Sequence, residues 1–136
     1  MGTVQFFDAA AAGFTALADA MRGRDTAIAK DELASTEVRV HHSGTEGGLQ
    51  LFELRLAPGT KGATHAHVED EIIVVVEGEL RFGAHVCTEG SSVMVPGGTL
   101  YGFEAGPVGC RFLNFRPRVD MTYITKDEFL ASREVS

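Results

Sequence analysis

The residues best suited to chemistry lie in one short stretch near the middle of the chain. His65 and His67 are two positions apart, and side chains on a β-strand alternate between faces, so both imidazoles are expected to point the same way. Glu71 has the same parity and joins them if the chain stays extended or turns back beside them. Two imidazoles and a carboxylate are typical ligands of a first-row transition metal, and they leave coordination positions open for substrate or oxygen. The spacing therefore predicts a metal site at these residues, with Glu69 as the alternative carboxylate.

At this stretch the chain resembles the cupin superfamily. The first motif of that family is a glycine, five residues, His-x-His, three or four residues, a glutamate, six residues and a glycine. The positions that fit it without a gap are Gly59, His65, His67, Glu71 and Gly78. The resemblance spans about residues 45–117 and implies that these histidines and this glutamate hold a metal.

The second cupin motif is only half present. Its pattern is a glycine, five residues, Pro-x-Gly, two residues, a histidine, three residues and an asparagine. Gly90, Pro96 and Gly98 match, but Tyr101 stands at the histidine position and Ala105 at the asparagine position. In the family, that histidine is usually the fourth metal ligand, so the likeness leaves the fourth ligand open.

Three roles for Tyr101 stay open on the sequence. The phenol is an unusual fourth metal ligand, which requires deprotonation of a group with a pKa near ~10. Alternatively, it stands near the metal as a proton donor or substrate hydrogen-bonding group. In the third interpretation its ring only fills the mouth of the barrel. Glu71 and Tyr101 are the residues expected to assist proton transfer.

The resemblance also implies the architecture. We expect an all-β protein, an antiparallel β-sandwich or jelly-roll barrel with short N-terminal and C-terminal helices. Strands separated by turn signals every eight to twelve residues independently favour a sandwich or small barrel. A pocket inside it would be lined by apolar side chains of matching strand parity, namely Ile73, Val75, Val95 and Phe103.

One domain with three parts is expected from the changes in pattern. Residues 1–36 form a helical or arm segment, because Phe14, Leu17 and Met21 have helical spacing and a helix over 9–22 would end at a glycine. Residues 37–120 alternate with period 2 and form the barrel. Residues 121–136 form a terminal helix, with Thr125 and Glu128 as a capping box.

Other polar residues favour ordinary structural roles. His41, His42 and His85 are interpreted as surface histidines, and Arg116 and Arg118 as a solvated pair, with carboxylate binding at the barrel rim as their alternative role. Glu53 and Arg55 are equally consistent with a surface ion pair and with one substrate clamp inside the barrel.

The composition excludes several classes of protein. A net charge of −7 and a pI near 5.1 argue against a nucleic-acid partner. No apolar run approaches the ~20 residues of a membrane span, and the N-terminus lacks the pattern of a secretory signal. The two cysteines, Cys87 and Cys110, have no metal-binding spacing and are expected to be reduced in a cytoplasmic protein.

These observations predict a small metal-dependent enzyme of the cupin type. It would hold one divalent transition metal, such as Fe, Mn, Ni or Zn, and act on a small oxygenated organic compound by dioxygenase-like oxidation or by isomerase or lyase chemistry. A non-catalytic small-molecule or metal-binding module is the alternative, and a metal-free epimerase or isomerase using His65 and Tyr101 as acid and base is the third. The resemblance further implies a homodimer, and a strand at 72–76 that is apolar on both faces agrees with one, unless a helix covers the second face.

Overall fold

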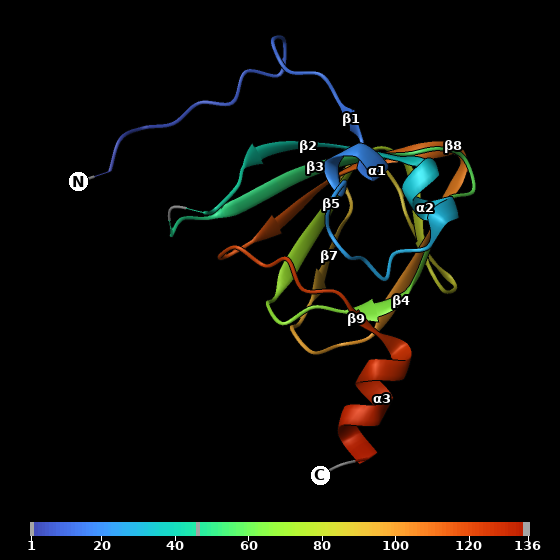
Figure 1. The fold of residues 1–136 in the computed structure, drawn as a ribbon. Helices are drawn as coiled ribbons and strands as arrows, with labels where there is room; N and C mark the ends of the chain where they lie inside the picture. Colours follow the sequence, from blue (N-terminus) through green and yellow to red (C-terminus); the bar gives the residue numbers. More distant parts are fainter. Residues whose placement is uncertain (1, 46, 135–136) are drawn as a thin grey trace.

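The computed structural model describes residues 2–45 and 47–134 and shows a β-barrel with short helices at its margins (Figure 1). In chain order the elements are β1 (Thr15–Ala16), α1 (Leu17–Ala20), α2 (Lys30–Ala34), β2 (Thr36–His42), β3 (Gln50–Leu56), β4 (Lys61–Ala66), β5 (Glu71–Phe82), β6 (His85–Cys87), β7 (Ser92–Val95), β8 (Tyr101–Arg116), β9 (Ile124–Thr125) and α3 (Lys126–Glu134). The expected all-β class is confirmed.

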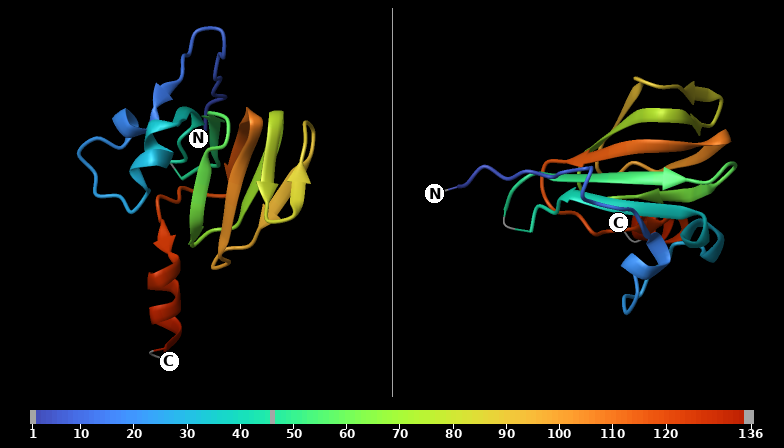
Figure 2. Two further views of the ribbon diagram at one scale, coloured as in Figure 1. Left: turned by 90° about the vertical axis from the view of Figure 1, so that its right-hand side faces the viewer. Right: turned by 90° about the horizontal axis from the view of Figure 1, so that it is seen from above.

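The long strand β8 connects the two halves of the barrel. Its second half pairs with β3, its first half pairs with β4, and its other edge pairs with β5 along most of its length. All of these pairings are antiparallel, and β5 also pairs with β6 and β7. Because β8 belongs to both halves, the strands β3, β4, β5 and β8 surround one interior (Figure 2). Side chains from all four strands line its cavity.

Strand β8 bends where glycines allow the two long strands to approach closely. Gly78 of β5 has a φ of +77°, and a Cβ placed on it would lie 2.1 Å from the carbonyl oxygen of Gly109. A side chain at this position would therefore collide with backbone. The register between β5 and β8 shifts on both sides of Gly78, as in a β-bulge, and such bulges bend strands into barrels.

Alternation along the strands separates the interior from the outer face. The core contains Leu56, Ile73, Val75, Leu80, Cys87, Ala105, Cys110 and Phe112. Cys87 and Cys110 are both buried and free, in agreement with the expected reduced pair. Burial raises the pKa of the Cys110 thiol to about 12, so it packs as an inert apolar group.

The helix expected over 9–22 is much shorter in the structure. Only Leu17–Ala20 is helical, and Asp8 instead closes a turn by accepting a hydrogen bond from the backbone of Ala10 at 3.1 Å. A short alanine-rich segment is marginally stable alone, and no residue of α1 is buried to stabilise a longer helix. The residues before β1 instead form an extended arm along the top of the barrel (Figure 1).

The C-terminal helix has the expected cap. The backbone N–H of Glu128 donates to Oγ1 of Thr125 at 3.1 Å, which is the hydrogen bond of a capping box. Helix α3 follows β9, which pairs with β4, and then projects away from the barrel (Figure 2). Most of its described side chains are exposed, so it does not cover a barrel face. No helix among the described residues is both long and apolar enough to cross a membrane.

Candidate functional site

The two predicted histidines face each other inside the barrel. The Nε2 atoms of His65 and His67 are 3.1 Å apart, and both residues are buried. The Nδ1 of His65 lies 2.7 Å from the carbonyl oxygen of Ala63, and the Nδ1 of His67 contacts the carbonyl oxygen of Thr122. Since a carbonyl can only accept, each Nδ1 must carry a hydrogen. In the neutral rings both Nε2 atoms therefore present lone pairs toward each other.

Two facing lone pairs repel unless a positive group lies between or beside them. The interior supplies one such group, because the guanidinium of Arg116 lies 3.4 Å from Nε2 of His67. Burial, and then other nearby charges, hold the pKa of His65 down at about 4. Burial and the Arg116 charge also lower the pKa of His67. Both imidazoles are thus kept in the neutral form that binds metal.

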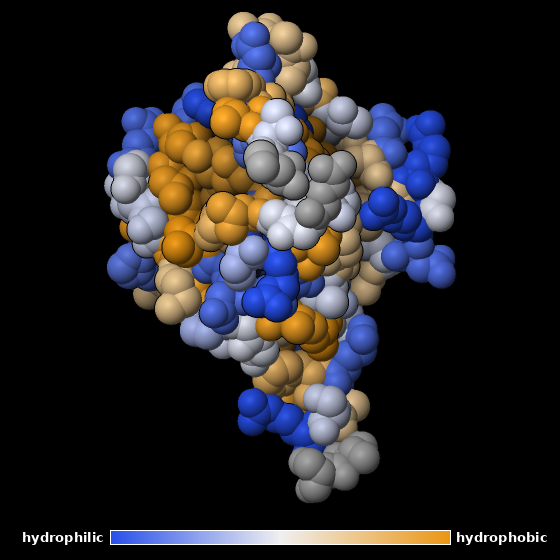
Figure 3. Space-filling model, turned by 90° about the vertical axis from the view of Figure 1, so that its left-hand side faces the viewer, coloured by the Kyte–Doolittle hydropathy of each residue, from blue (hydrophilic) through white to orange (hydrophobic). Residues whose placement is uncertain are grey.

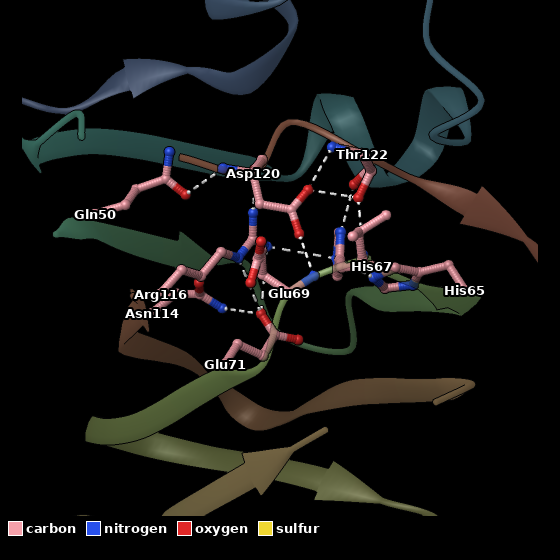
Figure 4. A network of polar contacts seen from close by, with 10 residues as sticks. Gln50, His65, His67, Glu69, Glu71, Asn114, Arg116, Asp120 and Thr122 are labelled. Carbon is pink, nitrogen blue, oxygen red and sulfur yellow. Dashed lines mark hydrogen bonds and ion pairs between the residues drawn. The ribbon is translucent and has the colours of Figure 1, made fainter. Parts of the chain in front are cut away.

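Glu71 lies at the same site but has other partners. Its Oε2 accepts hydrogen bonds from Nδ2 of Asn114 at 2.8 Å and from Arg116 at 3.2 Å, as Figure 4 shows. Its Oε1 is buried and has no hydrogen-bond partner among the described residues. Within residues 2–45 and 47–134, no group of three or more His, Cys, Asp and Glu side chains is arranged to hold a metal ion. The structure brings the two histidines together, and Asn114 and Arg116 engage the carboxylate.

The donor set nevertheless suits a divalent metal. Two imidazoles that bind one ion on adjacent positions at ~2.0–2.1 Å have nitrogens roughly 3.0–3.4 Å apart, and the observed separation of 3.1 Å falls in this range. The carbonyls on both Nδ1 atoms are the usual outer partners of metal-binding histidines. The charge of Glu71, whose Oε1 has no partner among the described residues, acts on both histidines. His65 and His67 would hold the ion, with Glu71 as the candidate third ligand.

A loop after β8 fixes the histidines from outside. Asp120 accepts hydrogen bonds from the backbone of Glu69 at 2.8 Å and of Thr122 at 2.8 Å, and the Thr122 carbonyl binds His67. Hydrogen bonds to Thr122 and Glu69 outweigh burial and lower the pKa of Asp120, which favours the carboxylate that makes them. Figure 4 shows this chain of contacts from the loop to His67. Glu69, the alternative ligand, instead forms an ion pair with Arg118 at 3.3 Å.

Tyr101 lies against the histidines and belongs to the neighbouring strand β8. It pairs with His65 in the sheet register, and the two ring centroids are 4.6 Å apart. Burial, and then the charge of Glu71, raise the pKa of Tyr101 far above its ordinary value. The phenol is therefore protonated in this structure, which is the form that a hydrogen-bonding group requires.

A cavity of about 310 Å³ opens beside the histidine pair. Of the predicted lining residues, Ile73 and Phe103 border it, whereas Val75 and Val95 are buried outside its lining. The ring of Phe103 rests on Gly62 of β4, where an added Cβ would lie 2.3 Å from the ring. This volume is within the range of sites for small organic molecules.

Several site residues differ from the sequence-based expectations. Arg116, expected to be solvated, is 7% exposed and points inward with Asn114, which was not singled out. Glu32 and Tyr123 also border the cavity and were not predicted. The strand alternation could have placed Asn114 and Arg116 in the interior, since both share the parity of the inward-facing Phe112 on β8. Glu32 lies in a segment with no clear period and gave no signal.

The outer face of the sheet also corrects the interpretation of its polar residues. Neither Glu53 nor Arg55 lies inside the barrel: Arg55 pairs with the exposed Glu37 at 3.0 Å, and Glu53 is buried on the outer face. His41 is not a free surface histidine, because it binds Glu53 at 2.7 Å and stacks on Phe7 at 3.8 Å between centroids.

Comparison with known proteins supports the architecture. The chain resembles the polyketide cyclase RemF from Streptomyces resistomycificus, with a TM-score of 0.69 and 19% identity over 96% of this chain and 94% of that one. KdgF from Halomonas sp. has a TM-score of 0.63 and 19% identity over 85% and 96% of the two chains. An RmlC-like cupin from Shewanella frigidimarina has a TM-score of 0.63 and 18% identity over 86% and 93%.

These likenesses show that the chain has the fold of the RmlC-like cupins. No protein-family model matches the sequence. No curated protein matches it either.

Proposed function

We propose that this protein is a small cupin enzyme that uses one divalent transition metal, held by His65, His67 and Glu71, to act on a small oxygenated organic compound. The observation that carries the proposal is the pair of Nε2 atoms, 3.1 Å apart with both Nδ1 atoms turned to carbonyls. Such a pair has the geometry of two ligands of one ion. A bound metal would supply Lewis-acid chemistry at a carbonyl or enol oxygen, or oxygen chemistry if it is iron.

The chain's own residues support the rearranging chemistry of an isomerase, lyase or cyclase. Tyr101, held neutral beside the histidines, can donate a proton or hydrogen bond to a substrate oxygen. Arg116 places a fixed positive charge at the same site, where it would stabilise negative charge developing on that oxygen. The likeness to a polyketide cyclase over nearly the whole of both chains agrees with a reaction of this kind on an aromatic or enolic compound.

The test is the metal content of protein purified without added metal. We expect close to one metal ion per chain in the wild type and a near-empty His65→Ala/His67→Ala variant. A His42→Ala/His85→Ala variant is the matched control, since it removes two histidines outside the cavity lining and should keep the metal. A wild-type protein that is empty and also refuses added divalent metals would overturn the proposal.

A metal-free acid–base enzyme using His65 and Tyr101 is the second candidate. The ion pair of Arg116 with Glu71 favours it, because a guanidinium beside these residues provides positive charge that a metal would otherwise provide. An empty wild type that still turns over an enolic or epimerisable substrate would select this candidate. A protein that holds no metal and turns over no substrate would be assigned as a non-catalytic binding module.

We also propose that the chain forms a homodimer through the outer face of its sheet. Leu51, Phe115, Ile72 and Met94 are consecutive cross-strand neighbours on this face, and Ile72 and Met94 are exposed. The helices contact other strands, so no described helix covers β5 there. Figure 3 shows apolar side chains gathered on the surface of the barrel. A sedimentation mass near one chain would remove this proposal.

A further inference from the structure

Glu32 is a buried acid in the wall of the same cavity. It lies on α2, outside the barrel strands, and is 8% exposed. It borders the cavity together with His65, His67 and Tyr101. Its Oε1 is buried and has no hydrogen-bond partner in the described part of the chain. A buried polar atom without a partner is uncommon in folded proteins, and in a cavity wall it can be satisfied by a ligand.

The surroundings of Glu32 differ from those of Glu71, the buried carboxylate behind the cavity wall. No cation pairs with it in the described residues, whereas Glu71 is paired with Arg116. Burial raises the pKa of Glu32, against a smaller opposing effect of a hydrogen bond from the backbone of Ala63. The same Ala63 accepts the hydrogen bond from Nδ1 of His65. One short piece of β4 therefore positions both the acid and the imidazole.

Tyr123 provides a second hydroxyl at this part of the cavity. Its ring stacks on His65, with centroids 4.4 Å apart and planes inclined by 10°. Tyr123 and Glu32 both border the cavity. Burial, and then the charge of Glu32, raise the pKa of Tyr123 to about 12. A carboxyl and a phenol thus line the same cavity as the stacked rings of His65 and Tyr123.

Several aromatic rings line the rest of the cavity, among aliphatic side chains. The rings that border it are Phe52, Tyr101, Phe103, Phe112 and Tyr123. Flat apolar walls with a few fixed polar groups suit an aromatic ligand, whose ring packs on the walls and whose substituents find the polar groups.

We propose that Glu32 and Tyr123 form a hydroxyl-binding subsite, in which Glu32 Oε1 hydrogen-bonds a phenolic or enolic hydroxyl of an aromatic ligand. This inference deepens the proposed function and rests on it, because it takes the cavity beside the histidine pair as the substrate site. It assigns to the α2 segment the recognition of one substituent, while the histidines, Arg116 and Tyr101 act at another part of the ligand.

The test compares two probes of similar size, 2-naphthol and 2-fluoronaphthalene, of which only the first carries a hydroxyl. Their affinities are measured by fluorescence titration up to about 1 mM. We expect the wild type to bind 2-naphthol at least ~10-fold more tightly than 2-fluoronaphthalene, the difference that one hydrogen bond to a buried group provides. Glu32→Met should remove this preference and leave the affinity for 2-fluoronaphthalene unchanged.

Two further variants and one control measurement separate this role from others. Asp31→Asn, at the exposed neighbouring acid of α2, should keep the preference. Glu32→Gln should restore part of it, because an amide still bonds a hydroxyl. The affinity of Glu32→Met for 2-fluoronaphthalene is the control measurement, because a merely structural Glu32 would weaken both probes, whereas the subsite requires that only 2-naphthol is weakened.

The metal content of the wild type, measured beside the His65→Ala/His67→Ala variant, distinguishes this inference from the proposed function. If the wild type holds no metal but its preference for 2-naphthol depends on Glu32, the subsite stands and the metal-dependent function fails. The subsite itself is overturned if neither probe binds, if Glu32→Met weakens both probes equally, or if the preference for 2-naphthol survives in Glu32→Met.

Discussion

Two buried glutamates, one on the outer face of the barrel and one inside it, both bind arginine but differ in how many of their carboxylate oxygens have hydrogen-bond partners. Glu53 lies on the outer face of β3 and Glu71 at the start of β5 in the interior, and each is at most 2% exposed. Glu53 uses both oxygens: Oε1 binds Arg39 at 2.8 Å and His41 at 2.7 Å, and Oε2 binds Arg111 at 2.6 Å. Glu71 uses only Oε2 and leaves Oε1 without a partner.

The difference separates a structural cluster from a site. The outer cluster is closed, because the carboxylate is surrounded by cations and the rings of Phe7 and Phe14 lie over Arg39. The inner cluster has an oxygen without a partner, Glu71 Oε1, and two histidine Nε2 lone pairs, and the histidines border a cavity. A buried cluster whose polar atoms all have hydrogen-bond partners has no free atom to bind a ligand. Polar atoms without partners therefore indicate the site better than charge or burial does.

The largest expected effect is that of Glu53→Gln. Removing one partner of a buried ion pair leaves the arginines uncompensated and costs about 3–5 kcal/mol of unfolding free energy. Denaturant unfolding measures this loss, and the metal content of the folded variant should not change. Glu37→Gln is the control, since its exposed pair with Arg55 contributes ~0–1 kcal/mol. Equal losses in the two variants would show that the outer cluster is not a closed structural unit.

Acid should destabilise the outer cluster specifically. Burial alone would raise the pKa of Glu53, but hydrogen bonds from Arg39, Arg111 and His41 outweigh it and hold the pKa at about 2 instead of 4.5. Because the folded pKa is the lower one, this stabilisation is complete above pH 4.5 and is lost as the pH falls toward 2. It amounts to roughly 3 kcal/mol. Unfolding at stepped pH should show the loss in the wild type, and an undiminished slope in Glu53→Gln would assign it to other carboxyls.

Replacing the inner glutamate should affect binding more than folding. In Glu71→Gln the amide oxygen can still accept from Asn114 or Arg116, so we expect a stability loss of ~1–3 kcal/mol, smaller than for Glu53→Gln. Metal affinity should fall at least ~10-fold, because the variant loses the negative charge and the unused carboxylate oxygen. Titration with zinc measures it. Unchanged affinity would leave the metal to the histidines alone and remove Glu71 from the ligand set.

The smallest effect is expected from the arm that covers the outer cluster. Phe7→Ala removes the ring stacked on His41 and the contact with the Arg39 guanidinium, which together are worth about 1 kcal/mol. A thermal melt should show a shift of a few degrees. Phe6→Ala is the matched control, since Phe6 is 90% exposed and should leave the melting temperature unchanged.

The sequence predicted the elements whose signals are local. Period-2 alternation and glycine turns specify the strands of the barrel, and the equal parity of His65 and His67 places them together. The capping box at Thr125 likewise depends on residues within one turn. Each of these patterns is decided by neighbours a few positions away, so it can be read without knowledge of the fold.

The missed residues depend on contacts that are distant in sequence. Arg116 is buried because Glu71, 45 positions earlier, meets it inside the barrel. Glu32 enters the cavity because α2 packs beside β2, and its own segment has no clear period. The helix expected over 9–22 failed for a related reason: Phe14 packs under Arg39 and Arg55 while Leu17 and Met21 border the cavity, and only Leu17–Ala20 is helical. Tertiary packing decided all three.

The ring of Phe103 resting on Gly62 makes the absence of a side chain a determinant of ligand size. A methyl group at position 62 would overlap the ring, so Phe103 can keep its place only while residue 62 is a glycine. Any larger residue there would move the ring and redraw one wall of the cavity without touching a polar group. Position 62 is therefore a place where the range of accepted molecules can change while the reactive residues stay as they are.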